Sequence, residues 1–143
     1  MTIAEFSLAH AVPPVRPGRT TPVNLAWEPD FALGDLRVSP STREVGRDGW
    51  TDGLEPRVMQ VLVALHQARG AVVSRDMLIA RCWDGRIVGD DAINRAIGRL
   101  RRLSRADRGA SFMIETIPRV GYRLRLGSGH AGWRAWLRCL LRR

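Results

Sequence analysis

The order in which hydrophobic periodicities follow one another along the chain constrains its fold most strongly. Short alternating runs separated by turn-forming Gly, Asp and Pro come first, at Phe31–Leu33, Leu36–Val38, Arg43–Val45 and around Trp50. Helical spacing then takes over, and strand-like runs return at 112–117 and 122–126, joined by Pro118, Arg119, Val120 and Gly121. This order predicts an antiparallel meander, a helical segment and a terminal hairpin, and therefore an α+β fold.

Three helices are predicted between the meander and the hairpin. Their starts are marked by a proline, a serine N-cap and a pair of acidic residues, all of which favour helix N-termini. The spans are Pro56 to Gly70, the segment after Ser74 as far as Asp84-Gly85, and Asp90 to Leu103. Val72 and Val73 form a short extended link between the first two helices. The pattern predicts a winged helix-turn-helix with an N-terminal four-stranded antiparallel sheet and a C-terminal β-hairpin wing.

The chain divides into three parts by composition. Residues 1–26 are rich in Pro and Arg without sustained periodicity, which predicts a disordered leader, and residues 27–127 form the winged-helix domain. Residues 128–143 comprise a Gly-rich linker and a basic amphipathic helix, 133–143, with Trp and Leu on one side and Arg on the other. Three roles for this helix stay open: packing on the domain or a second protomer, peripheral contact with a membrane, and a fraying or vestigial end.

Charge is distributed unevenly along the chain. The net charge is +9, and all 23 basic residues are Arg. Before residue 90 there are 10 Arg and 10 acidic residues, whereas from residue 90 onward there are 13 Arg and 4 acidic residues. The absence of Lys fits a GC-rich genome as well as phosphate recognition. The uneven placement favours a polyanionic partner, either nucleic acid or an anionic membrane surface.

Several function classes have little support in the sequence. The longest aliphatic run, Val61–Leu65, is far shorter than the roughly 20 residues that span a bilayer, and no secretory signal is evident, so we expect a cytoplasmic protein. Cys82 and Cys139 match no metal-ligand spacing, and the three His residues form no nucleophile relay. No phosphate-binding Gly motif is present. We therefore expect no metal, no cofactor and no enzymatic activity.

The third predicted helix, 90–103, carries the candidate DNA-reading face. On a wheel of about 100° per residue its apolar residues share one arc of roughly 120°; they are Ile93, Ala96, Ile97, Leu100 and Leu103. The opposite side carries Asn94, Arg95, Gly98 and Arg102, and the flanks carry Arg99 and Arg101. No acidic residue lies between Ile93 and Ser104, whereas merely solvated faces usually alternate in sign. This helix is predicted to enter a major groove.

Arginine and asparagine suit the chemistry of base edges and phosphates. Arg can bind O6 and N7 of guanine, Asn can bind N6 and N7 of adenine, and neighbouring Arg side chains can neutralise phosphates. The wing, 117–123, adds Arg119 at its tip, and a protruding Arg is attracted into a narrow minor groove; an ordinary surface charge on a turn is the alternative. The predicted DNA-binding residues are Asn94, Arg95, Arg99, Arg101, Arg102, Arg119 and Arg123.

Four motifs in order resemble a known family. They are Leu54–Leu62, Val73–Leu78 with Trp83, Asp90–Arg102 and Glu115–Leu124. Together they resemble the C-terminal effector domain of OmpR/PhoB-type bacterial transcriptional regulators, which act in phosphorelay signal transduction. The variants Leu-Glu-Pro at 54–56 and Ile-Pro-Arg at 117–119 resemble the CadC/ToxR-like subgroup.

The resemblance implies a sequence-specific transcriptional regulator that binds double-stranded DNA. It implies binding to tandem half-sites, which is compatible with a homodimer on DNA or with monomers, and the loop 84–89 corresponds to the segment that in relatives can face RNA polymerase. It also places the predicted Arg and Asn residues at exposed positions of the recognition helix and at the wing tip. The alternative is a winged-helix interaction module that binds a protein partner or a membrane surface without sequence-specific DNA binding.

Overall fold

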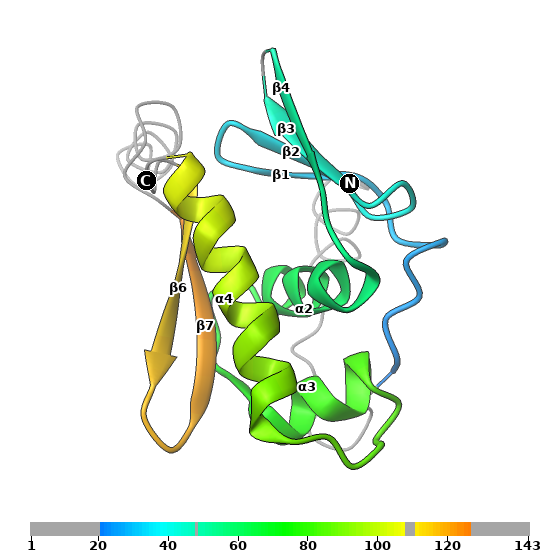
Figure 1. Cartoon of the computed structure of the whole chain (residues 1–143), viewed down its shortest axis with the longest axis vertical. Coiled ribbons are helices and arrows are strands. Elements are labelled where there is room, and N and C mark those ends of the chain that lie inside the picture. Colours follow the sequence, from blue (N-terminus) through cyan, green and yellow to red (C-terminus); the bar gives the residue numbers. More distant parts are fainter. Residues whose placement is uncertain (1–20, 48, 108–110, 127–143) are drawn as a thin grey trace, which may run out of the picture.

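The N-terminal part of the fold is an antiparallel sheet of four short strands. The computed structural model describes residues 21–47, 49–107 and 111–126 of the chain. The strands are β1 (Phe31–Leu33), β2 (Leu36–Ser39), β3 (Glu44–Arg47) and β4 (Trp50–Gly53), and they pair in chain order (Figure 1). Leu33, Leu36, Val38 and Val45 are buried beneath this sheet. The meander predicted from the alternating runs is confirmed.

Three helices follow, as the sequence predicted. They are α2 (Pro56–Gln67), α3 (Arg75–Cys82) and α4 (Asp90–Ala106). The Ser74 hydroxyl caps α3 by accepting a hydrogen bond from the Met77 amide at 3.1 Å. Helix α4 extends three residues beyond the predicted end at Leu103 because Ser104 remains buried against the following strand. In the part of the chain that the structure describes, no helix is long and apolar enough to cross a membrane.

The C-terminal sheet has three strands, in the order β5-β7-β6. The hairpin of β6 (Phe112–Ile117) and β7 (Gly121–Leu126) was predicted, and the short extended link was predicted without a pairing partner. In the structure β5 (Val73–Ser74) pairs with β7, with Val73 opposite Tyr122. Gly121 permits this approach, because a Cβ there would lie 2.1 Å from the Val73 carbonyl oxygen. The wing is therefore anchored to the segment between α2 and α3.

The domain begins earlier than the sequence analysis placed it. Val23 is 3% exposed, its amide donates to the Arg81 carbonyl at 2.9 Å, and its carbonyl accepts from the Gln60 side chain. The predicted boundary between residues 26 and 27 is thus too late, because one apolar residue among prolines produces no periodicity. Residues 1–20, the linker and the predicted helix 133–143 lie outside the described residues.

Side-chain contacts join the N-terminal sheet to the helices. Phe31 of β1 stacks on His66 of α2 with the ring centroids 3.9 Å apart, and burial, with a smaller effect of Arg69, lowers the pKa of His66. Arg47 of β3 pairs with the buried Asp107, at the end of α4. These contacts fix α2 and α4 relative to the strands, which lie above α2 and beside the upper end of α4 in Figure 1.

Two glycines provide a matched test of this packing. Gly121→Ala is expected to lower the free energy of unfolding by about 1–3 kcal/mol, because its Cβ would clash with the β5 backbone. Gly98→Ala is expected to raise it by about 0.5–1 kcal/mol, because the position is helical and nothing lies within 4 Å of the added Cβ. Urea denaturation followed by circular dichroism measures both. Equal effects of the two substitutions would contradict the close β5–β7 approach.

Candidate nucleic-acid interface

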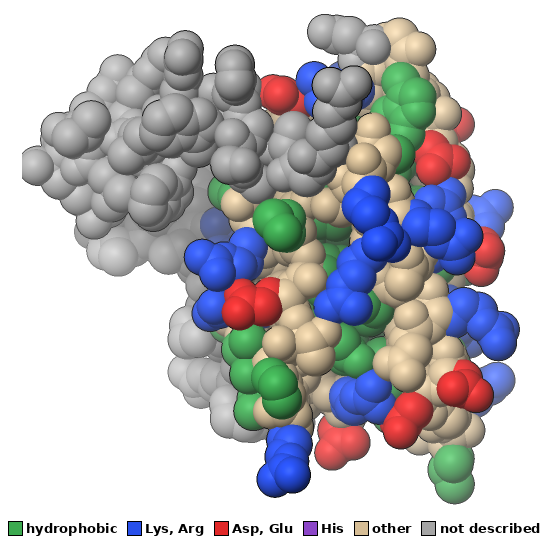
Figure 2. All heavy atoms as spheres, turned by 60° about the vertical axis from the view of Figure 1, so that its left-hand side comes forward, with side chains coloured by type: hydrophobic (Ala, Val, Ile, Leu, Met, Phe, Trp, Pro, Cys, Tyr) green, Lys and Arg blue, Asp and Glu red, His purple; other side chains and the backbone are tan. Residues whose placement is uncertain are grey.

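Helix α4 presents its unburied side to solvent next to the wing. Ile93, Ala96, Ile97, Leu100 and Leu103 are buried, as the helical wheel predicted. The opposite side is exposed at Arg95, Arg102 and Arg105. Figure 2, turned so that the wing side comes forward, shows basic side chains spread over this face with acidic ones among them. Arg105 was missed because the predicted helix stopped at Leu103, although extending the wheel places it on this side.

Three arginines on this face have open guanidinium groups. Within the described residues, Arg95, Arg102 and Arg105 make no side-chain hydrogen bond or ion pair. They are therefore available to an anionic ligand without first losing an internal partner. We define Arg95, Arg102 and Arg105 as the open arginines of α4.

Arg99 points to the N-terminal sheet instead. Its guanidinium forms an ion pair with Asp52 of β4 at 2.8 Å and donates to the Gly53 carbonyl at 3.2 Å. Three quarters of the Arg99 side chain is buried, since 25% remains exposed. Arg99 therefore joins α4 to β4, and its charge is largely compensated by the Asp52 carboxylate.

Arg101 occupies the other flank and covers the open edge of the wing. Its guanidinium donates to the Ile114 carbonyl at 3.4 Å and to the Thr116 hydroxyl. One turn further along α4, Ser104 donates to the Phe112 carbonyl at 2.6 Å. Strand β6 is an edge of its sheet, so these carbonyls have no partner strand. Arg101 and Ser104 thus set the distance between α4 and the wing.

Asn94 belongs to a cluster that links α3, α4 and β7. Its side-chain oxygen accepts from Arg75 at 2.9 Å and from the Tyr122 hydroxyl at 3.3 Å. Arg75 also pairs with Asp90, and its guanidinium carbon lies 5.8 Å from the centre of the Tyr122 ring. The hydrogen bond with Tyr122 is the largest influence raising the pKa of Arg75. Sequence reasoning missed Arg75 and Tyr122, because no spacing rule connects one helix start to a distant strand.

The wing carries an exposed arginine at its tip. Arg119 adopts a left-handed conformation with φ of 64° in the turn between β6 and β7, which is closed by a hydrogen bond from Val120 to Ile117. Arg123, further along β7, pairs with Glu115 of β6 at 2.8 Å, and this hydrogen bond lowers the pKa of Glu115. Arg125 reaches the same carboxylate at 3.3 Å. Two arginines sharing one carboxylate leave this part of the wing positive.

The loop between α3 and α4 presents an apolar side chain to solvent. Asp84 and Gly85 both have positive φ, and this reversal ends α3. Ile87 then has no burial at all, with a relative exposure of 103%. A single exposed apolar side chain is common on protein surfaces, so the exposure of Ile87 does not by itself define a contact surface.

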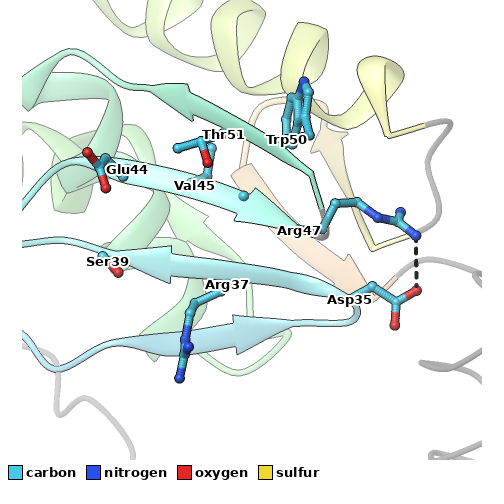
Figure 3. A pocket seen from close by; sticks show the side chains of 9 residues that line it. Asp35, Arg37, Ser39, Glu44, Val45, Arg47, Trp50 and Thr51 are labelled. Carbon is cyan, nitrogen blue, oxygen red and sulfur yellow. Dashed lines mark ion pairs between the residues drawn. The ribbon is translucent and has the colours of Figure 1, made fainter.

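A second surface feature, a hollow of about 430 Å³, lies on the N-terminal sheet. Figure 3 shows Arg47 directed toward Asp35, with which it pairs at 3.7 Å, while Arg37 and Glu44 lie on neighbouring strands. The lining mixes both signs of charge, so it offers no continuous field to a polyanion. Within the described ranges, no group of three His, Cys, Asp or Glu residues is placed to hold a metal ion.

Known proteins resemble this chain over the same region. A family model described as "Transcriptional regulatory protein, C terminal" matches residues 53–124. The transcriptional activator CadC of Escherichia coli K12 is 36% identical over 98 residues, which make up 68% of this chain and 19% of CadC. The transcriptional regulatory protein CseB of Streptomyces coelicolor is 39% identical over 96 residues, covering 66% of this chain and 39% of CseB. This chain therefore spans a minor part of either relative.

A solved structure shows that the similarity includes the fold. The DNA-binding domain of E. coli CadC superposes with a TM-score of 0.60 at 34% identity, covering 68% of this chain and 94% of that domain. The winged helix-turn-helix fold predicted from the sequence is thereby confirmed.

The anchored and open arginines should differ in their effects on stability. Arg99→Ala and Arg101→Ala are each expected to lower the free energy of unfolding by about 1 kcal/mol, because each removes charge-assisted hydrogen bonds to another element. Arg102→Ala should change it by less than about 0.5 kcal/mol. Chemical denaturation of the three variants checks this. A loss in Arg102→Ala as large as in the other two would contradict the division.

Proposed function

Because the chain belongs to the family of transcriptional regulatory protein C-terminal domains, we propose that it binds double-stranded DNA sequence-specifically and regulates transcription. The observation that carries the proposal is the set of open arginines on α4, beside a wing with a further exposed arginine, Arg119, at its tip. Guanidinium groups without internal partners are suited to phosphate oxygens and to the acceptor edge of guanine. The solved CadC domain, which its name describes as DNA-binding, supports the same function here.

In the proposed complex α4 lies in the major groove and the wing, 117–123, reaches the minor groove. Arg95 lies in the first half of α4, nearer to the base edges, because recognition helices insert their N-terminal part most deeply. Arg102 and Arg105 lie in the second half and are suited to phosphates. Arg119 enters the minor groove, where the negative potential is strongest in sequences whose minor groove is narrow.

The other predicted DNA-binding residues take supporting roles in this proposal. Arg99 and Arg101 hold α4 against β4 and β6 through the contacts described above, and they orient the reading face rather than form it. Arg123 adds positive charge to the wing while bound to Glu115.

The assembly around this domain follows from the same proposal. We infer that two copies occupy tandem half-sites and form a homodimer on DNA. The loop 84–89, in which Ile87 is exposed, is proposed to contact RNA polymerase, as the family resemblance implies. The protein is proposed to act in the cytoplasm and to have no catalytic role, in keeping with relatives named as transcriptional regulators.

Two substitutions on the open face should act differently on binding. Arg95→Ala is expected to weaken binding to the preferred site by about 1–3 kcal/mol and to relax the preference for one base, because it removes a base contact. Arg102→Ala is expected to weaken binding to preferred and random duplexes alike, because it removes a phosphate contact. Fluorescence anisotropy with both duplexes, followed by selection from a random library, measures the two effects.

Arg37→Ala is the matched control for these variants. It removes one exposed Arg from β2 of the N-terminal sheet and leaves α4 and the wing intact. Its affinity for an isolated half-site should stay close to that of the unmodified protein. If all three variants lost affinity equally on both duplexes, the proposed reading role of α4 would be wrong.

A further inference from the structure

The amide of Asn94 is held in one orientation by two donors. Its side-chain oxygen accepts from Arg75 at 2.9 Å and from the Tyr122 hydroxyl at 3.3 Å. A guanidinium has only donors, so the amide must turn its oxygen toward Arg75. The amide nitrogen, with its two N–H donors, is then the polar part of Asn94 left for another molecule.

Backbone pairing fixes the two groups that hold the amide. Arg75 begins α3 directly after β5, and Val73 of β5 lies opposite Tyr122 of β7. Tyr122 is 4% exposed, so its ring is held in the core by packing. Arg75 is further held by Asp90, at the start of α4, and by the face of the Tyr122 ring. The orientation of Asn94 is thus set by contacts from α3 and β7 to its own helix.

This orientation conflicts with the adenine contact expected from residue type alone. A bidentate contact with adenine requires the Asn oxygen to accept from N6 and the Asn nitrogen to donate to N7. In this structure the oxygen already has two partners. Turning it to adenine would leave the Tyr122 hydroxyl, on a buried residue, without its acceptor.

Resting on the DNA-binding function proposed above, we propose that Asn94 is a donor-only base contact that reads an acceptor in the major groove. Guanine presents two such acceptors, N7 and O6, and thymine presents O4. Adenine presents N7 beside an amino donor, and the amide nitrogen cannot accept from that amino group, so adenine is the poorer purine. Cytosine presents an amino donor at that edge and is rejected. Arg75 is the positioning residue that holds the amide in this orientation.

The test is selection of binding sites from a randomised duplex library by the full chain and its variants. Asn94→Asp keeps an oxygen facing Arg75 and Tyr122 but replaces both N–H donors, whereas Asn94→Ala removes the amide altogether. The unmodified protein is expected to favour guanine or thymine at one position of each half-site by about 5–10-fold. Both Asn94 variants should lose that preference, and Asn94→Asp should unfold at the same urea concentration as the unmodified protein or a higher one.

Two further variants separate positioning from contact. Arg75→Met removes the main donor to the Asn94 oxygen, so the preference at the same base position should relax while the preferences at other positions persist. Arg102→Ala is the matched control: it should lower affinity for every sequence and keep the preference at the Asn94-dependent position.

Two results would overturn the proposal. One is an adenine preference that depends on Asn94 and weakens when purine, which lacks the 6-amino group, replaces that adenine. The other is a set of base preferences that both Asn94 variants leave intact, whether affinity falls uniformly or stays unchanged. In either case the unmodified protein still selects a site, so the DNA-binding function stands. Failure of that function has a different signature, because the unmodified protein would then enrich no sequence.

Discussion

The attachment of α4 along both of its flanks determines what the domain can offer to a ligand. One side of this helix is buried in the core, which fixes its axis but leaves its flanking side chains undetermined. Hydrogen bonds of Arg99 hold one flank against β4, and hydrogen bonds of Arg101 and Ser104 hold the other flank against the edge of β6. A helix held in this way has little freedom to rotate about its own axis, so the residues between the two flanks form a surface of defined geometry. Pre-organised surfaces of this kind lose less entropy on binding.

The same attachments sort the arginines into two groups with different electrostatic roles. Arg99 has a carboxylate partner of its own, Asp52, so it adds little to the field outside the protein, whereas Arg123 and Arg125 share Glu115 and leave a net positive charge on the wing. The open arginines of α4 and Arg119 have no such compensation among the described residues. A count of charges therefore overstates the number of phosphate contacts, and the arrangement of acidic residues on β4 and β6 decides which guanidinium groups remain available.

The sequence predicted the elements and the buried side of α4 well, because both follow from spacing along the chain. It did not predict the partners of Arg99 and Arg101, since a helical wheel places a side chain around the axis without showing which strand lies opposite. Arg75 and Tyr122 were missed for a related reason: their meeting depends on β5 pairing with β7, and a two-residue strand carries no periodicity. Val23 was missed because a single apolar residue among prolines resembles a linker.

The salt dependence of DNA affinity, compared among the unmodified protein, Arg102→Ala and Arg99→Ala, distinguishes arginines that contact phosphate from arginines that hold α4 in place. Each phosphate contact contributes about −0.9 to the slope of log affinity against log salt concentration. We expect a slope steeper than about −4 for the unmodified protein, about one unit shallower for Arg102→Ala, and unchanged for Arg99→Ala at temperatures where that variant is folded. A slope that is shallower for Arg99→Ala and unchanged for Arg102→Ala would contradict the assignment of anchored and open arginines.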